Sequence, residues 1–187
     1  MSKLNGKTVA ILATNGFEQS ELESPRDRMR KEGAEVHVIS PKTGEIKGWD
    51  KDDWGRAVKV DKALSEATVE EYDALILPGG QINPDQLRKD KEAVAFVHEF
   101  FNTKKPLAAI CHAPWLLIEA GVVEGRDITS YESIATDVKN AGGNWKDEPV
   151  VVHEAMITSR NPGDLEAFND KIVEEICEGR HQDRQAA

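Results

Sequence analysis

The fold is indicated most directly by one stretch, Pro106-Leu107-Ala108-Ala109-Ile110-Cys111-His112-Ala113-Pro114-Trp115. This stretch changes from an apolar strand pattern to a helical pattern with almost no loop between them. Such a turn brings the backbones of strand and helix close together, and the three alanines around it provide the small side chains that this requires. Pro114 suits a first helical turn, where its missing N–H leaves no hydrogen bond unmade. Cys111 is therefore expected at the carboxyl end of a buried strand.

Strand and helix patterns alternate along the rest of the chain. Strands are predicted at residues 8–13, 35–39, 74–77 and 107–110, with a late pair at 150–152 and 156–158. Helices are predicted at residues 20–32, 90–101, 113–120, 132–140 and 163–177. The alternation predicts an α/β fold with a mainly parallel sheet covered by helices.

Two segments depart from this alternation. Residues 40–59 are rich in Gly, Lys and Asp and carry Trp49 and Trp54, which predicts a short hairpin excursion. Pro25 falls inside the first helical pattern, so we expect either a kink there or a helix that starts near Ser24 with Pro25 in its first turn.

Composition limits the class of protein. The 187 residues suit one α/β domain over 1–187, with a polar tail at 181–187 that we expect to be frayed. The net charge of −10 argues against binding to nucleic acid or anionic membranes, and no apolar run approaches the roughly 20 residues of a membrane helix. The start of the chain lacks the pattern of a signal peptide, so we expect a cytoplasmic protein with Cys111 and Cys177 as free thiols.

Cys111 has two interpretations from its local sequence. At a strand–helix turn a side chain is lifted toward the crevice where open α/β sheets bind ligands. The helix start there supplies free N–H groups and the positive end of the helix dipole, which favour a thiolate. The alternative is a small buried hydrophobic residue, the commoner role of a free intracellular cysteine. The local sequence leaves the two about equal.

Two other strand ends favour the first interpretation. The strand at 74–77 is followed by Pro78-Gly79-Gly80, whose amides, together with the N–H of His112, would form an oxyanion hole. Glu18 follows the first strand and is a candidate to hydrogen-bond the sulfur or to carry a proton. The alternatives are an ordinary turn for the glycines and a solvated helix-start acid for Glu18. A Cys, a Gly pair and an acid at one sheet edge together indicate an active site.

At this point the residues resemble a known family over nearly the whole chain. The similarity is to the ThiJ/PfpI superfamily, and within it to the PfpI-like branch, which includes proteins classed as cysteine peptidases, deglycases and general stress proteins. Its landmarks are residues 16–22, Pro25, residues 33–36, residues 77–80, residues 109–114 and residues 140–143.

The resemblance implies a flavodoxin-like three-layer sandwich and assigns roles to residues. Cys111 would be the nucleophile, His112 its neighbouring base, and Glu18 the acid that contacts the sulfur. It also implies a homodimer or a higher homo-oligomer, because in this branch an acid from a neighbouring subunit completes a Cys-His-acid triad. The matching position here is Asp85, a shorter acid in a longer loop, and an alternative role for Asp85 is that of a first-turn helix acid.

The resemblance also limits the chemistry. It implies an enzyme without cofactor or metal that acts on a small carbonyl compound or a glycated protein in stress protection, as a deglycase or a glutathione-independent glyoxalase. An intracellular peptidase is the first alternative, and a non-catalytic redox-sensing or chaperone-like protein is another. A glutamine amidotransferase would need a His-x-Glu pair, whereas His153 is followed directly by Glu154.

Several reactive or aromatic residues are not assigned to the site. Cys177 is expected near the core, and the histidines at 37, 98 and 153 are expected to be structural or surface residues. Packing is the expected role of Trp115, and Trp49, Trp54 and Trp145 are expected on the surface or at an interface. For Arg160 the sequence leaves open a role in orienting an anion or a partner loop.

Overall fold

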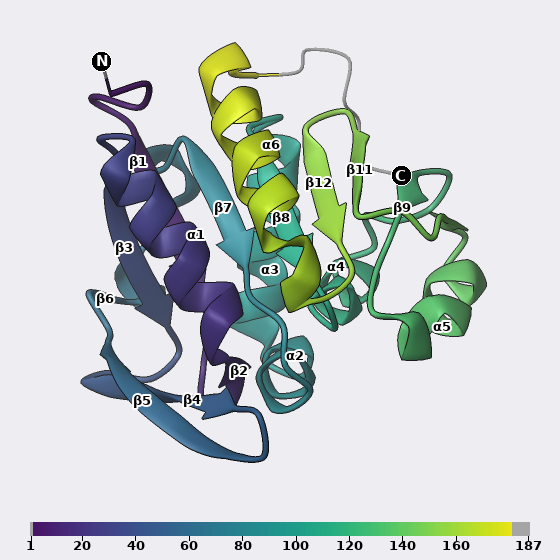
Figure 1. Ribbon diagram of the computed structural model, residues 1–187, viewed down its shortest axis with the longest axis horizontal. Coiled ribbons are helices and arrows are strands. Elements are labelled where there is room, and N and C mark those ends of the chain that lie inside the picture. The colour runs from purple at the N-terminus through teal and green to yellow at the C-terminus, as the bar shows by residue number, and fades with distance from the viewer. Residues whose placement is uncertain (1, 181–187) are drawn as a thin grey trace.

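The computed structural model describes residues 2–180, and its central feature is a seven-stranded sheet (Figure 1). All neighbouring strands of this sheet pair in parallel, except that β11 runs antiparallel to β12 at one edge. In spatial order the strands are β11 (Val150–His153), β12 (Met156–Ser159), β8 (Leu107–Ile110), β7 (Ala74–Leu77), β1 (Thr8–Leu12), β3 (Glu35–Ser40) and β6 (Lys62–Ala63).

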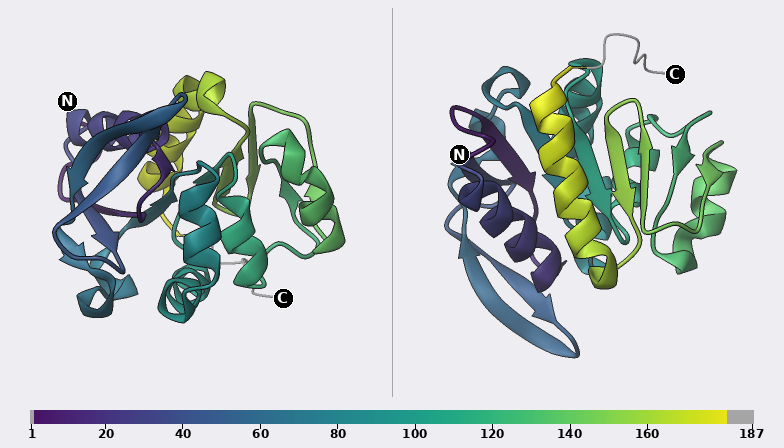
Figure 2. Two further views of the ribbon diagram at one scale, coloured as in Figure 1. Left: turned by 90° about the horizontal axis from the view of Figure 1, so that it is seen from below. Right: turned by 45° about the horizontal axis from the view of Figure 1, so that its top comes forward.

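Helices cover both faces of this sheet, and Figure 2 shows the two layers from further sides. Buried apolar side chains of α1 and α6 pack on one face of the strands, and those of α3 and α4 pack on the other. The helices are α1 (Gln19–Lys31), α2 (Ile82–Arg88), α3 (Lys91–Asn102), α4 (Pro114–Glu119), α5 (Ala135–Asn140) and α6 (Leu165–Glu178), with short 3₁₀ turns η1 (Leu64–Glu66), η2 (Val69–Glu71), η3 (Glu132–Ile134) and η4 (Pro162–Asp164).

The strand sequences explain the two layers. Successive residues of a strand point to opposite faces, so Ala10 and Leu12 belong to the α3/α4 side while Val9 and Ile11 belong to the α1/α6 side. Strands with both faces buried read as continuous apolar runs, as β7 and β8 do. This arrangement confirms the predicted α/β sandwich with a mainly parallel sheet.

The predicted hairpin excursion is also confirmed. Strands β4 (Glu45–Asp50) and β5 (Asp53–Lys59) pair antiparallel, and β4 pairs with β2 (Phe17–Glu18). The hairpin lies beside α2 at the lower end of the molecule in Figure 1, the end to which the arrows of the parallel strands point. The excursion thus reaches the carboxyl edge of the sheet.

The predicted range of the first helix is confirmed within one residue, because α1 starts at Gln19 and continues through Pro25. The alternative start near Ser24 is wrong. Two other short elements were given no predicted range. One is helix α2, although the alternative role of Asp85 as a first-turn helix acid is confirmed by its position in α2. The small parallel pair β9 (Asp127–Ile128) and β10 (Asn144–Trp145) is too short to leave a periodic signal.

Two predictions about the whole chain have different outcomes. Within residues 2–180, no helix combines the length and the apolar composition that a membrane crossing requires. The single domain over 1–187 stays a prediction, and its tail at 181–187 lies outside the described residues.

Candidate active site

Cys111 lies at the sharp turn between β8 and α4, in an uncommon backbone conformation. Its φ is 65°, which is in the left-handed region that residues with a Cβ rarely adopt. Two hydrogen bonds hold this conformation: the Cys111 N–H donates to the Ser159 carbonyl at 3.1 Å, and the Cys111 carbonyl accepts from the Tyr131 N–H at 2.8 Å. The side chain lines a cavity of about 540 Å³ at the carboxyl edge of the sheet. The turn therefore has the geometry of a nucleophile elbow.

His112 contacts the sulfur directly. Its Nδ1 lies 3.1 Å from Cys111 Sγ. Neighbouring side chains diverge in a regular strand or helix, and the left-handed φ of Cys111 removes that obstacle. The turn that presents the thiol to the cavity therefore also brings the base to it.

The environment of His112 fixes its orientation and its charge. The ring stacks on Tyr131, with centroids 4.8 Å apart, and meets the edge of Trp115 at 5.1 Å. Its Nε2 lies 3.3 Å from Ser133 Oγ. Burial lowers the pKa of His112, so the ring is neutral near pH 7. In the tautomer with the proton on Nε2, the ring donates to Ser133 and directs the Nδ1 lone pair at the thiol.

The acid beside the sulfur is Glu21, which corrects the assignment of that contact to Glu18. Glu21 lies in the first turn of α1 and is fully buried. Its Oε2 accepts the Gly79 N–H at 2.9 Å, and its carboxyl lies close enough to the Cys111 side chain for each group to shift the pKa of the other. Glu18 precedes the helix, is half-buried, accepts from the Ser20 hydroxyl at 3.2 Å and lines the same cavity.

The sequence did contain a signal for Glu21. The buried face of α1 includes Leu22, Pro25 and Met29, and Glu21 lies on that same face. A carboxylate in a core-facing position is rarely tolerated without a specific partner. Glu18 was chosen because it lies nearest to the end of the first strand. The buried face of α1 instead identifies Glu21 as the acid that points toward the core.

The pKa values of the two acids differ because of their burial. Burial raises the pKa of Glu21 to about 8, the charge of Glu18 adds to this, and hydrogen bonds from Gly79, Cys111 and Gly80 oppose it. Glu21 is therefore protonated at neutral pH. Burial also raises the pKa of Glu18, against the hydrogen bond from Ser20.

The pKa of the Cys111 thiol is raised, whereas the position at a helix start predicted a thiol that ionises readily. Burial raises the pKa of Cys111, and a charged Glu21 raises it further, whereas the amides of Gly80 and His112 lower it. Because Glu21 holds its proton at neutral pH, its charge then no longer opposes the thiolate. The amide donors of Gly80 and His112 are thus the groups that favour ionised sulfur.

The predicted oxyanion hole is partly corrected. The Gly79 amide donates to Glu21, so it is not available to a substrate. The amides of Gly80 and His112 lower the pKa of the Cys111 thiol by hydrogen bonding and remain as donors. Gly79 is required for another reason: a Cβ at this position would lie 2.5 Å from Glu21 Oε2 and 2.6 Å from Cys111 Cβ.

Asp85 is separate from this cluster within one chain. It lies exposed in the first turn of α2, and among residues 2–180 no hydrogen bond joins it to His112. Two residues before it in α2, Asn83 is fully buried and links two loops of the site. Its side chain accepts from the Thr14 N–H at 2.8 Å and donates to the Pro78 carbonyl at 2.9 Å.

The cavity wall includes residues that were assigned elsewhere or missed. Trp49 and Lys51 come from the β4–β5 hairpin, and Ile82 comes from α2. Tyr131 follows β9 and forms another part of the wall. Only the folded hairpin reveals the role of Trp49, because nothing in its local sequence connects it with Cys111.

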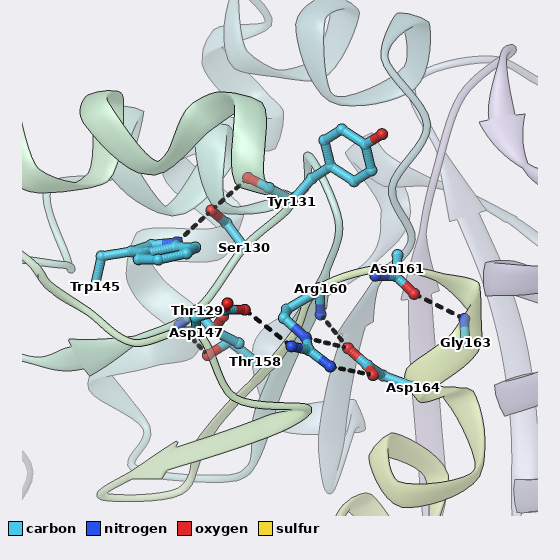
Figure 3. A network of polar contacts seen from close by, with 10 residues as sticks. All are labelled: Thr129, Ser130, Tyr131, Trp145, Asp147, Thr158, Arg160, Asn161, Gly163 and Asp164. Carbon is cyan, nitrogen blue, oxygen red and sulfur yellow. Dashed lines mark hydrogen bonds and ion pairs between the residues drawn. The ribbon is translucent and has the colours of Figure 1, made fainter.

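A polar network fixes the segment that carries Tyr131, as Figure 3 shows. The Thr129 N–H donates to Thr158 Oγ1 at 2.9 Å. The Trp145 indole donates to Ser130 Oγ at 3.0 Å, and Ser130 Oγ donates to the Tyr131 carbonyl at 2.9 Å. These bonds hold the tyrosine backbone next to the elbow, and the ring can therefore support His112.

Arg160 pairs with two aspartates of its own chain, as Figure 3 also shows. Its Nε donates to Asp164 Oδ2 at 2.9 Å and its Nη1 to Asp147 Oδ1 at 2.9 Å. Both aspartates are therefore its partners, and the guanidinium joins the start of α6 to the loop after β10.

Cys177 and the histidines at 37, 98 and 153 were predicted to lie outside the site. Cys177 is exposed on α6, which corrects its expected core position, and both cysteines are free. The histidines at 37, 98 and 153 each have a local partner: His37 pairs with Glu35, His98 meets the Ala120 carbonyl, and His153 accepts from the Asp127 amide. Within residues 2–180, no three His, Cys, Asp or Glu side chains are grouped to hold a metal ion.

Comparison with known proteins finds one family. A family model described as DJ-1/PfpI family matches residues 7–175. The chain is 46% identical over 168 residues to "Protein/nucleic acid deglycase 2" of Escherichia coli (strain K12), covering 89% of this chain and 96% of that protein. It is 44% identical over 164 residues to "Putative cysteine protease YraA" of Bacillus subtilis (strain 168), covering 87% of this chain and 94% of that protein.

Solved structures agree with the fold. A two-domain protein from Anabaena variabilis with DJ-1/ThiJ/PfpI-like and ferritin-like domains superposes with a TM-score of 0.87 at 35% identity. The match covers 96% of this chain and 52% of that one, so the chain spans about half of the two-domain protein. The flavodoxin-like sandwich expected from the resemblance is thereby confirmed.

Proposed function

The chain belongs to the DJ-1/PfpI family, and from this premise we propose that it is a cysteine-dependent enzyme that removes small dicarbonyl adducts from proteins. The observation that carries the proposal is the strained turn that places Cys111 Sγ 3.1 Å from His112 Nδ1 in an open cavity. The name of the E. coli relative, a deglycase at 46% identity, supports the class of reaction. The resemblance noted in the sequence is confirmed by the family match.

The first step uses the residues at the turn. Neutral His112 takes the proton of the Cys111 thiol, and the thiolate attacks the adduct carbon. For a methylglyoxal adduct on a side-chain nitrogen, the S–C bond forms as the C–N bond breaks, and the nitrogen leaves with the proton. Any oxyanion at this carbon is stabilised by the amides of Gly80 and His112.

The second step releases the product. The hemithioacetal isomerises as a proton moves from its carbinol carbon to the neighbouring carbonyl carbon, which leaves a lactoyl thioester on Cys111. Glu18 lines the cavity and carries that proton. Water then hydrolyses the thioester to lactate and restores the thiol. Free methylglyoxal enters the same sequence by addition of the thiolate to its aldehyde.

The partners of the enzyme are part of the proposal. We expect a small carbonyl compound or a glycated protein as substrate, and a homo-oligomer in which Asp85 reaches His112 of a neighbouring subunit. The net charge of −10 supports protein and small-molecule substrates over polyanions and anionic membranes.

Peptide hydrolysis is a second candidate, supported by the printed name of the Bacillus subtilis relative. The same thiolate and the same amide donors suit attack on a peptide carbonyl. The cavity of about 540 Å³ has the size of a small-ligand site, which favours a small adduct over a long peptide.

The test compares wild type with Cys111→Ser and Cys177→Ser on methylglyoxal, a glycated peptide and an unmodified peptide. We expect wild type and Cys177→Ser to turn over the first two substrates equally, because Cys177 is exposed and outside the cavity. Cys111→Ser should lose at least a hundredfold in rate, on the order of the loss typical of an essential catalytic group.

Other outcomes would assign other functions. Full turnover by Cys111→Ser would reject the nucleophile. Cleavage of the unmodified peptide alone would select the peptidase. Loss of a cellular phenotype in Cys111→Ser, with no carbonyl turnover by wild type, would select a redox-sensing role for the thiol.

A further inference from the structure

The β4–β5 hairpin supplies a wall of the Cys111 cavity. Trp49 and Lys51 line that cavity together with Glu18, although they are more than 50 residues from Cys111 in the chain. Trp49 is half-buried and Lys51 is exposed. A ligand attacked by the sulfur therefore meets the hairpin on its way in.

The hairpin is held firmly against the segment that leads into α1. Glu18 pairs with Trp49 in the parallel β2–β4 register. The Arg56 N–H donates to Gln19 Oε1 at 2.8 Å. A Cβ at Gly55 would lie 1.8 Å from Gln19 Oε1, so a larger residue there would displace this side chain from its hydrogen bond. The position of Trp49 relative to Glu18 is consequently fixed by backbone pairing.

The indole ring of Trp49 is itself oriented. Its N–H donates to the Lys51 carbonyl at 2.8 Å, across a turn in which Lys51 has a φ of 60°. The ring of Trp54 packs edge-on against it, with centroids 5.5 Å apart. The hairpin turn thus holds an oriented indole ring in the wall of the cavity.

Acids outnumber bases in the hairpin turn beside Trp49, although its one base, Lys51, lines the cavity. Glu18 lies next to Trp49, and Asp50 is close enough to act on the Glu18 carboxyl. The turn Asp50-Lys51-Asp52-Asp53 contains three acids and one base. An aromatic face beside carboxylates attracts flat cations, through cation–π contact and through charge.

We propose that Trp49 and Glu18 make the enzyme selective for carbonyl adducts carried on a guanidinium group, as on an arginine side chain. This inference rests on the proposed function. The adduct of a guanidinium keeps a planar cation next to the carbon that Cys111 attacks. That cation stacks on Trp49 and pairs with Glu18, which holds the reacting carbon near the sulfur.

The experiment measures lactate release from three preformed methylglyoxal adducts. They are the adducts of N-acetylarginine amide, which is cationic, of N-acetylcysteine amide, which is neutral, and of N-acetylcysteine, which is anionic. Wild type, Trp49→Leu, Trp49→Phe and Lys51→Met are compared by the ratio of kcat/KM for the cationic adduct to kcat/KM for the neutral one.

We expect Trp49→Leu to lower this ratio about tenfold, since it keeps apolar bulk but removes the π face. Trp49→Phe keeps an aromatic face and should retain the ratio within about threefold. Lys51→Met should retain or increase the ratio, because this substitution removes a positive charge from the wall of the Cys111 cavity.

Two results would overturn the inference. One is an unchanged ratio in Trp49→Leu. The other is a wild-type preference for the anionic adduct that Lys51→Met abolishes, which would show that Lys51 recognises the substrate. Failure of the proposed function is distinct, because wild type would then turn over none of the adducts or Cys111→Ser would turn over all of them.

Discussion

Glu21 is the residue whose placement most affects the reactivity of Cys111. Its carboxyl is fully buried, accepts the Gly79 amide and contacts the thiol. Burial raises its pKa to about 8 from the ordinary value of 4.5. At neutral pH the Glu21 carboxyl is therefore protonated in the folded protein and ionised in the unfolded chain.

Stability should consequently depend on pH through Glu21. Between pH 4.5 and about 8 the folded protein keeps a proton that the unfolded chain has released. The stabilisation is complete below pH 4.5 and is lost as pH rises through 8. We expect the free energy of unfolding of wild type to fall relative to Glu21→Gln over this window, measured by urea unfolding of the reduced proteins.

The control for this prediction is Glu18→Gln, which changes a half-buried acid of the same cavity. It should show a smaller pH-dependent difference, because the pKa of Glu18 is raised less. Parallel curves for wild type and Glu21→Gln would contradict a protonated, buried Glu21.

Ser133 is the hydroxyl that orients His112 within one chain. Its Oγ lies 3.3 Å from Nε2, while stacking on Tyr131 holds the ring plane. Ser133→Ala should lower kcat about fivefold with little change in KM, which corresponds to one hydrogen bond of roughly 1 kcal/mol.

The matched variant is Ser133→Thr, which keeps the hydroxyl and should restore kcat. The pH profile of kcat gives a second measurement, because loss of the Nε2 partner changes the pKa of His112. An unchanged kcat and an unchanged profile would show that ring stacking alone positions the base.

At the scale of elements, Gly79 determines how closely β7 approaches the elbow. A Cβ there would lie 2.5 Å from Glu21 Oε2 and 2.6 Å from the Ile110 carbonyl. Gly79→Ala should therefore cost about 1–3 kcal/mol of stability through overpacking, measured by urea unfolding. Gly163→Ala is the control, since its new methyl group would meet only the side chain of Asn161, at 3.0 Å. Equal losses in both variants would contradict the role assigned to Gly79.

Elements with long apolar periodicity could be predicted from the sequence. Strands β1, β3, β7 and β8 lie at the predicted positions within one or two residues, as does the hairpin. Helix α2 was missed because its buried polar anchor, Asn83, makes the segment resemble a loop. Patterns of apolar residues predict elements that pack on a core, and they miss elements held by side-chain hydrogen bonds.

Residues of the candidate site could be predicted from the sequence only where they directly follow a predicted strand. Cys111, His112 and Gly80 follow directly from strand ends, and the structure brings them together. The acid was placed one helical turn away from its position, because the choice between Glu18 and Glu21 depends on which face of α1 packs inward. Trp49 depends on how a hairpin packs against a distant segment, which local sequence does not encode.

At the scale of the whole molecule, no acid among residues 2–180 of one chain contacts the outer nitrogen of His112. Among residues 2–180 that nitrogen meets a serine, and Asp85 lies exposed on α2 at the same carboxyl edge of the sheet. This geometry suits the proposal that a second copy of the chain contributes Asp85.

Mixed oligomers test that proposal. If Asp85 acts on the neighbouring subunit, Asp85→Ala and Cys111→Ser should each have low activity alone. A hybrid dimer of the two contains one site with both Cys111 and Asp85. Random mixing by co-refolding should restore about a quarter of wild-type activity, measured on methylglyoxal. No recovery, or full activity of Asp85→Ala alone, would contradict action across the interface.

The left-handed backbone at Cys111 also has an evolutionary consequence. Glycine is the residue that adopts this conformation without steric cost, so the fold on its own favours glycine at position 111. Only selection for a reactive side chain opposes that preference. Descendants that lose the chemistry are therefore expected to drift toward glycine here, and a glycine at this position would identify a pseudoenzyme before any assay.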